Sequence, residues 1–188
     1  MSVARRSAGR RPVRRPREKV VLDAKAAKLA AFELLAQKAW SRREMLRRLK
    51  RRGAPEEVAG AVVGELQSRG YLDDEAFARW WAQARARGRR VGSVRLRQEL
   101  AARGIPRELA AAAVGAAFEE TAEMDRALDA GRRKLPGLLR AGRDRAPARL
   151  RDYLLRRGYP APVVLRVVKT LLAGELPDGA AADDDREV

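Results

Sequence analysis

Arginines are the residues best suited to chemistry in this chain, and they crowd into one short segment. Six of them fall between positions 85 and 97, at Arg85, Arg87, Arg89, Arg90, Arg95 and Arg97. No Asp or Glu interrupts the run, so we expect an arginine-rich loop that no acid neutralises. Guanidinium groups at this density bind phosphates or carboxylates, because their fork of N–H donors fits both anions. The segment is predicted to bind a polyanion; a solvated charge run is the alternative.

Catalytic groups are scarce by comparison. The 188 residues contain no His and no Cys, which removes the commonest general base, the commonest zinc ligands and any disulfide. Asp73, Asp74 and Glu75 form one acidic cluster, but no second cluster partners it, and helix N-termini favour carboxylates in any case. We predict that the cluster caps a helix. The chain is expected not to be an enzyme and to need neither a metal nor another cofactor.

Three aromatic residues offer another candidate surface. Phe77, Trp80 and Trp81 could stack nucleobases. Their spacing of three and four residues is also what the buried stripe of a helix requires. We expect these rings in the core, with one Trp partly exposed.

Charge is spread unevenly along the chain. The formal net charge is +17, from 42 Lys and Arg against 25 Asp and Glu, which favours polyanionic partners. We expect a disordered basic arm over residues 1–22 and a disordered acidic tail over residues 174–188. Neither a run of 18 apolar residues nor a secretory signal occurs, so we expect no membrane span and a cytoplasmic protein.

An internal repeat organises the rest of the chain. Three segments align without gaps on apolar residues four apart, followed by Arg-Gly-x-Pro and a second apolar stretch. The Arg-Gly pairs are Arg52–Gly53, Arg103–Gly104 and Arg157–Gly158, separated by 51 and 54 residues. The spacing predicts a helix that ends at each Gly, in the left-handed conformation. The Pro then opens the next helix at its first position.

A further helix is expected before each of these pairs. Asp23 caps the first, which runs to about Lys38, and Ser41 with Glu44 forms a capping box for the helix that follows. Asp73 or Asp74 caps the second, and the third covers residues 119–134. The predicted fold is therefore all-α, with three tandem three-helix repeats over residues 23–68, 69–118 and 119–173. Units this small should stack into an elongated, curved array and share a core.

A helix-turn-helix transcription factor is the competing interpretation, because two helices flank each glycine turn. The helices after the turns argue against it. Residues 109–117 are almost entirely Ala, Val and Gly, and residues 163–172 are nearly as apolar. Such helices cannot hydrogen-bond to base edges, so sequence-specific readout is not expected.

Four segments resemble the RecX family of recombination regulators. They are AFELL at 31–35, SRREML at 41–46, RGYLDDEAFA at 69–78, and the arginine-rich segment that leads into RLRQELAARGI at 95–105. The resemblance spans residues 24–172, and the order and spacing of every segment agree. Trp40 replaces a common basic residue, Ser93 replaces a common proline, and the third repeat is the most degenerate. These departures concern local surface contacts rather than the fold.

The resemblance implies a protein that lies in the groove of the RecA–DNA filament and modulates, usually by suppressing, ATP hydrolysis and strand exchange by RecA. The implied partners are the RecA filament and single- and double-stranded DNA without sequence preference, and the protein is expected to be a monomer. The candidate contact residues are the six arginines above together with Arg43, Arg47, Arg51 and Arg103. Two alternatives remain open: a sequence-independent nucleic-acid binder that acts without RecA, and a structural adaptor for another protein.

Overall fold

The computed structural model describes residues 21–88, 91–119 and 123–173, and the regular structure in these ranges is entirely α-helical. The predicted basic arm, apart from its last two residues, and the predicted acidic tail lie outside them. Repeat 1 consists of α1 (Ala24–Gln37), α2 (Arg42–Arg51) and α3 (Glu56–Ser68). Repeat 2 consists of α4 (Asp74–Gly88), α5 (Ser93–Ala102) and α6 (Arg107–Glu119). Repeat 3 consists of α7 (Glu123–Arg140), α8 (Ala146–Arg156) and α9 (Ala161–Leu172).

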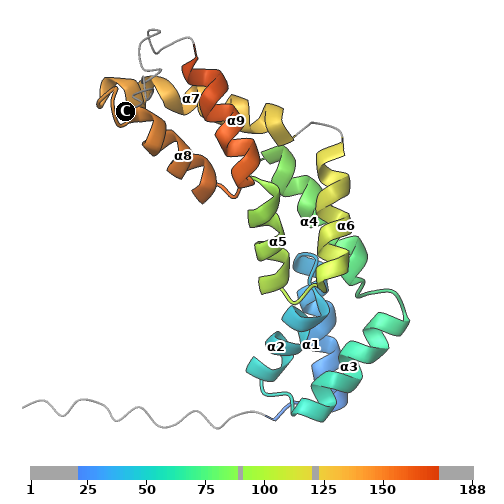
Figure 1. The fold of residues 1–188 in the computed structure, drawn as a ribbon. Helices are drawn as coiled ribbons and strands as arrows, with labels where there is room; N and C mark the ends of the chain where they lie inside the picture. The colour runs from blue at the N-terminus through green and yellow to red at the C-terminus, as the bar shows by residue number, and fades with distance from the viewer. Residues whose placement is uncertain (1–20, 89–90, 120–122, 174–188) are drawn as a thin grey trace, which may run out of the picture.

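The three repeats follow one another along an elongated and curved array, as predicted (Figure 1). The second helix of each repeat, α2, α5 and α8, lies along one side of the array, on the left in Figure 1. Within each repeat, the first and second helices both pack against the third. The fold therefore presents its three second helices in a row on the same side.

Local sequence explains where the helices begin. The Asp23 carboxylate accepts a hydrogen bond from the Ala26 N–H at 2.7 Å. Ser41 and Glu44 form the predicted capping box of α2. The Asp73 carboxylate accepts from the N–H groups of Glu75 and Ala76 at 2.8 and 3.0 Å, which confirms its predicted capping role.

The glycine turns also have the predicted conformation. Gly53, Gly104 and Gly158 have φ of 104°, 86° and 82°, a region in which residues with a Cβ are strained. The expected place of the prolines is off by one residue. Pro55 and Pro160 are the N-cap residues of α3 and α9, with extended ψ of 155° and 143°, and the helices start after them.

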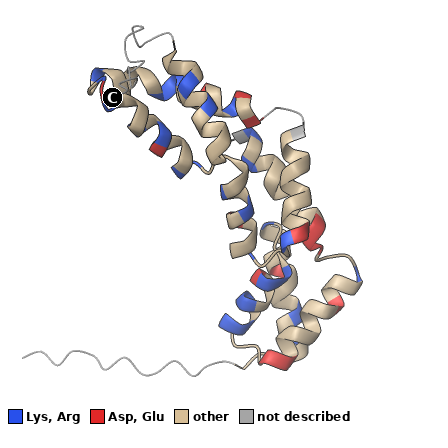
Figure 2. Ribbon diagram, viewed as in Figure 1, with Lys and Arg blue, Asp and Glu red and all other residues tan. Residues whose placement is uncertain are grey.

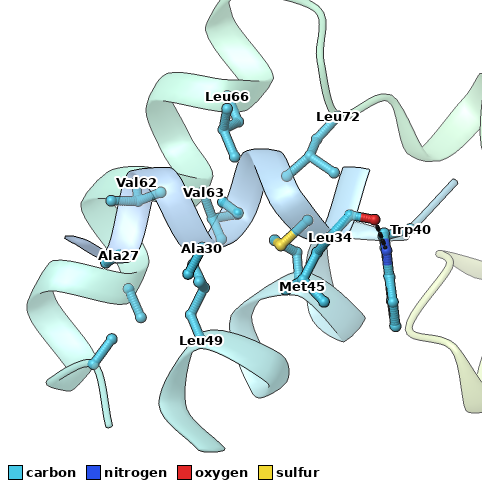
Figure 3. Close-up of a cluster of buried hydrophobic side chains, with 13 residues drawn as sticks. Ala27, Ala30, Leu34, Trp40, Met45, Leu49, Val62, Val63, Leu66 and Leu72 are labelled. Atoms are coloured by element: carbon cyan, nitrogen blue, oxygen red, sulfur yellow. Dashed lines mark hydrogen bonds between the residues drawn. The ribbon is translucent and has the colours of Figure 1, made fainter. Parts of the chain in front are cut away.

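Each repeat has its own hydrophobic core, so the expectation of a shared core is wrong. Met45, Leu49 and Leu66 are fully buried between α1, α2 and α3 (Figure 3). Separate clusters fill repeat 2, around Leu96 and Leu100, and repeat 3. Three helices of 10–18 residues enclose enough apolar surface to close a core by themselves. Hydrogen bonds across the two boundaries connect neighbouring repeats.

Two finer expectations also change. The first helix of repeat 3 was expected to end near residue 134, but α7 continues to Arg140 and holds Pro136 inside it. The aromatic stripe on α4 divides: Phe77 is buried, Trp81 is half-buried, and Trp80 has 52% of its surface exposed. Both Trp rings are therefore at least partly exposed, where one was expected.

Candidate polyanion-binding face

Repeats 1 and 2 meet where the start of α2 rests on the glycine turn after α5. The Ser41 hydroxyl donates a hydrogen bond to the Arg103 carbonyl oxygen at 2.6 Å. The Arg42 N–H donates to the Asp74 carboxylate at 2.9 Å. The N-terminus of α2 thus finds partners in repeat 2 for groups that a helix start leaves unpaired.

The Arg103 side chain completes this joint. Its guanidinium forms an ion pair with Glu44, whose side chain is only 7% exposed. The same group lies 3.7 Å from the centroid of the Trp81 ring, within cation–π range. Arg103, one of the predicted RecA or DNA contacts, is thus paired with Glu44 across the boundary between two repeats.

Repeats 2 and 3 meet in the same way. The Gly92 N–H donates to the Arg157 carbonyl oxygen at 2.9 Å, and the Val94 N–H donates to the Gly158 carbonyl oxygen at 3.1 Å. A Cβ on Gly92 would lie 2.2 Å from the Gly158 oxygen, so the approach requires glycine. Ser41 and Gly92 are the N-cap residues of α2 and α5. The repeated joint brings the second helices to one side of the array.

The predicted arginine loop is partly helix and partly neutralised. Arg85 and Arg87 belong to α4, which extends to Gly88. Arg85 donates two hydrogen bonds to the Glu99 carboxylate, at 2.8 and 2.7 Å, so the expectation that no acid pairs with it is wrong. Arg95 also reaches Glu99, at 3.3 Å. Arg89 and Arg90 lie outside the described residues.

Glu99 is the acid that forms ion pairs with Arg85 and Arg95. Burial would raise the pKa of its carboxyl, but hydrogen bonds and the positive charge of Arg85, with further hydrogen bonds from Arg95 and Trp81, outweigh burial and lower the pKa. Glu99 therefore stays ionised and cancels charge in the middle of the array. Arg97, on the same helix, donates to the Ser93 hydroxyl at 3.3 Å and keeps its charge exposed.

Helix α2 carries the densest set of exposed cations without an acidic partner in the described part of the chain. The predicted residues Arg43, Arg47 and Arg51 recur every four positions and are exposed. Arg42 and Arg48 add to them. The acid of α2, Glu44, is buried and committed to Arg103. Among the described residues, α2 is therefore a candidate for the site beside the arginines at 85–97.

We call the exposed Lys and Arg side chains of the three second helices the second-helix face. In Figure 2 the ribbons of these helices are blue at their Lys and Arg positions, while the acidic starts of α3 and α4 lie elsewhere. Residues of this face that the sequence did not single out are Arg42, Arg48, Arg149, Arg151 and Arg156. All five lie on the second helix of a repeat, which was the available signal. The face offers anions a line of guanidinium groups on rigid helices.

A shallow hollow of about 360 Å³ opens where repeats 1 and 2 meet. Its lining residues include Arg47, the ring of Trp81 and the two ion pairs of Arg103 and Arg85. Glu99 and Glu44 are each paired with an arginine in these ion pairs. Arg47 is therefore the lining cation without an acidic partner among the described residues. An anion entering the hollow would meet Arg47 first.

The apolar third helices pack into their repeats, as predicted. α6 packs against both α4 and α5, and α9 against both α7 and α8. Ala113 and Val114 of α6, and Val164 and Val167 of α9, are buried by this packing.

Among the described residues, no helix is long and apolar enough to cross a membrane.

Two segments of the chain match models of one protein family. Residues 27–66 match the family model described as RecX, first three-helix domain, and residues 73–114 match RecX, second three-helix domain. The regulatory protein RecX of Amycolatopsis mediterranei is 31% identical over 160 residues, which cover 85% of this chain and 91% of the relative. The regulatory protein RecX of Streptomyces coelicolor is 32% identical over 159 residues, covering 85% and 84%.

Solved structures show the same fold. A crystal structure of RecX from Lactobacillus salivarius superposes with a TM-score of 0.70 at 14% identity, over 79% of this chain and 96% of that one. A crystal structure of regulatory protein RecX superposes with a TM-score of 0.71 at 17% identity, over 77% and 72%. The helical array is therefore a known architecture.

Proposed function

The chain belongs to the RecX family of regulatory proteins, and we propose that it regulates a RecA recombinase by laying its second-helix face along the RecA–DNA filament. One observation carries the proposal: α2, α5 and α8 lie on the same side of an elongated array, and each carries exposed arginines. Such a surface fits a groove that offers both phosphate and acidic side chains. A long array contacts several filament subunits at once.

The proposed effect is inhibition of ATP hydrolysis and strand exchange. The ATP chemistry belongs to RecA, and this chain contributes binding alone. An array that bridges neighbouring RecA subunits favours one filament geometry over the others, and a ligand shifts a conformational equilibrium by its differential affinity for the states. Arg43, Arg47, Arg51 and Arg97 are the proposed primary contacts, with Arg87 and Arg95 alongside.

DNA contacts in this proposal are made to the backbone and carry no sequence preference. The second helices present guanidinium groups, which bind phosphates of any sequence. We also propose that the protein acts as a monomer. The Leu22 N–H donates to the Gly53 carbonyl oxygen at 3.1 Å, so the glycine turn at the free end of repeat 1 is already covered.

The test is a pull-down at matched salt, with RecA filaments on single-stranded DNA compared with the same DNA bare. We expect retention on the filament at salt concentrations that release the protein from bare DNA. Equal retention on both would favour a nucleic-acid binder that acts without RecA. Retention on neither the RecA filament nor the bare DNA would contradict the proposal.

A further inference from the structure

Trp40 occupies an unusual position between α1 and α2. Only 6% of its surface is exposed, although charged residues surround it in the sequence. Its indole N–H donates a hydrogen bond to the Leu34 carbonyl oxygen at 2.8 Å (Figure 3). The ring thus satisfies a carbonyl in the last turn of α1 and lies against the core of repeat 1. Its orientation is fixed.

Two cations lie on this fixed ring. The Lys38 ammonium is 3.9 Å from the ring centroid, and the Arg48 guanidinium carbon is 5.1 Å from it. The two charges are therefore within about 9 Å of each other. Both side chains are exposed, and neither has an acidic partner among the described residues. Cation–π contact holds a charge in place without neutralising it.

The contrast with the other arginines of the array is direct. Arg85, Arg95 and Arg103 are held by carboxylates of Glu99 and Glu44, which cancel the charge that they position. Lys38 and Arg48 are held by an aromatic ring and keep theirs. Long basic side chains lose rotamer entropy when they bind, and a group that orders them beforehand reduces that cost.

We propose that Trp40 is a positioning residue that holds the charges of Lys38 and Arg48 within about 9 Å of each other, as a clamp for the phosphate backbone of single-stranded nucleic acid. The inference rests on the proposed function, because Arg48 belongs to the second-helix face. A single strand offers regularly spaced phosphates on a flexible line, so two fixed cations can engage neighbouring phosphates of one strand. Acidic side chains on a folded protein have no such regular spacing.

The test measures binding of the full-length protein to a labelled oligothymidylate over a range of salt concentrations. Replacing both cations, Lys38→Gln with Arg48→Gln, should reduce the log–log salt slope by about 1.4, since each phosphate contact to a single strand contributes about 0.7. Trp40→Leu should leave the slope unchanged and weaken binding about two- to fivefold, the equivalent of one exposed cation–π contact. Trp40→Phe, which keeps an aromatic face, should restore most of that loss.

A double-substitution cycle separates positioning from a structural role. In the Lys38→Gln, Arg48→Gln background, Trp40→Leu should weaken DNA binding no further. If Trp40→Leu weakens binding equally in both backgrounds, the ring acts only through the fold and the clamp is wrong. Polyglutamate at matched salt is the second arm: loss of polyglutamate and oligothymidylate binding to the same degree would show that the pair responds to charge alone, which also overturns the proposal.

The clamp and the proposed function fail in different ways. If the cycle shows no coupling while the wild-type protein still binds RecA filaments, the clamp is wrong and the regulator stands. If coupling is found while the wild-type protein does not bind RecA filaments, the regulator is wrong and the clamp stands. Melting of each variant checks that the fold is intact.

Discussion

The hydroxyl of Ser41 donates to the carbonyl oxygen of Arg103 at 2.6 Å, across the boundary between the first two repeats. The hydroxyl oxygen of Ser41 also accepts a hydrogen bond from the Glu44 N–H at 3.2 Å. One side chain therefore caps α2 and ties repeat 1 to repeat 2. This joint fixes where α2 lies relative to α5, so the arrangement of the second-helix face depends on it.

Ser41→Ala should destabilise the protein by about 1–2 kcal/mol, because it removes a helix cap and leaves the Arg103 carbonyl without this donor. Urea unfolding measures the change. Ser68→Ala is the matched control, since the Ser68 hydroxyl is exposed and donates only to the Glu65 carbonyl oxygen within its own helix. Its effect should stay below about 0.5 kcal/mol. Equal effects from both would mean that the joint contributes nothing.

Substitutions at two glycines should change stability in opposite directions. Gly104 has φ of +86°, and a Cβ there would lie 2.3 Å from Cδ of Arg43, so Gly104→Val should cost at least about 1 kcal/mol. Gly115 lies within α6, with nothing within 4 Å of an added Cβ. Gly115→Ala should stabilise by up to about 1 kcal/mol through helix propensity. Thermal melting of the two variants provides the comparison, and stabilisation by Gly104→Val would contradict the turn assignment.

The ion pair of Arg85 with Glu99 should make stability depend on acid. The pKa of Glu99 is lowered from its ordinary value of 4.5, so the folded state favours the ionised carboxylate. This stabilisation is fully present above pH 4.5 and is lost as the pH falls through the lowered value. The difference in unfolding free energy between the wild type and Glu99→Gln should therefore shrink below pH 4.5. A difference that stays constant from pH 7 to pH 3 would contradict the pairing.

The sequence predicted the parts of this protein that local patterns determine. The glycine turns, the Ser41–Glu44 capping box and the Asp73 cap follow from residue types at fixed spacing, and all are present. The ion pairs could not be predicted in this way. Glu99 lies 14 residues from Arg85, and Arg103 lies 59 residues from Glu44, so each pair depends on how separate helices meet.

The pairing of individual arginines could not be predicted for the same reason. A run of arginines in the sequence indicates charge density, but only packing shows which charges acids cancel. Arg85 and Arg103 form ion pairs between helices, whereas Arg48, one of many arginines in α2, lies exposed on Trp40. The separate cores of the three repeats could not be predicted either, because the repeat pattern in the sequence is the same for units that share a core and units that do not.

The most direct measurement of the central claim is ATP hydrolysis by the cognate RecA on single-stranded DNA, with the wild-type protein and two variants of matched charge. Arg47→Glu with Arg51→Glu reverses two charges on α2, and Arg166→Glu with Lys169→Glu reverses two exposed charges on α9, the third helix of repeat 3. Both pairs are surface residues, so melting should change little. We expect the wild type and the α9 variant to suppress hydrolysis at substoichiometric amounts, and the α2 variant to lose most of this effect, because attraction becomes repulsion. Full suppression by the α2 variant, or equal loss in both variants, would contradict the assignment of the second-helix face.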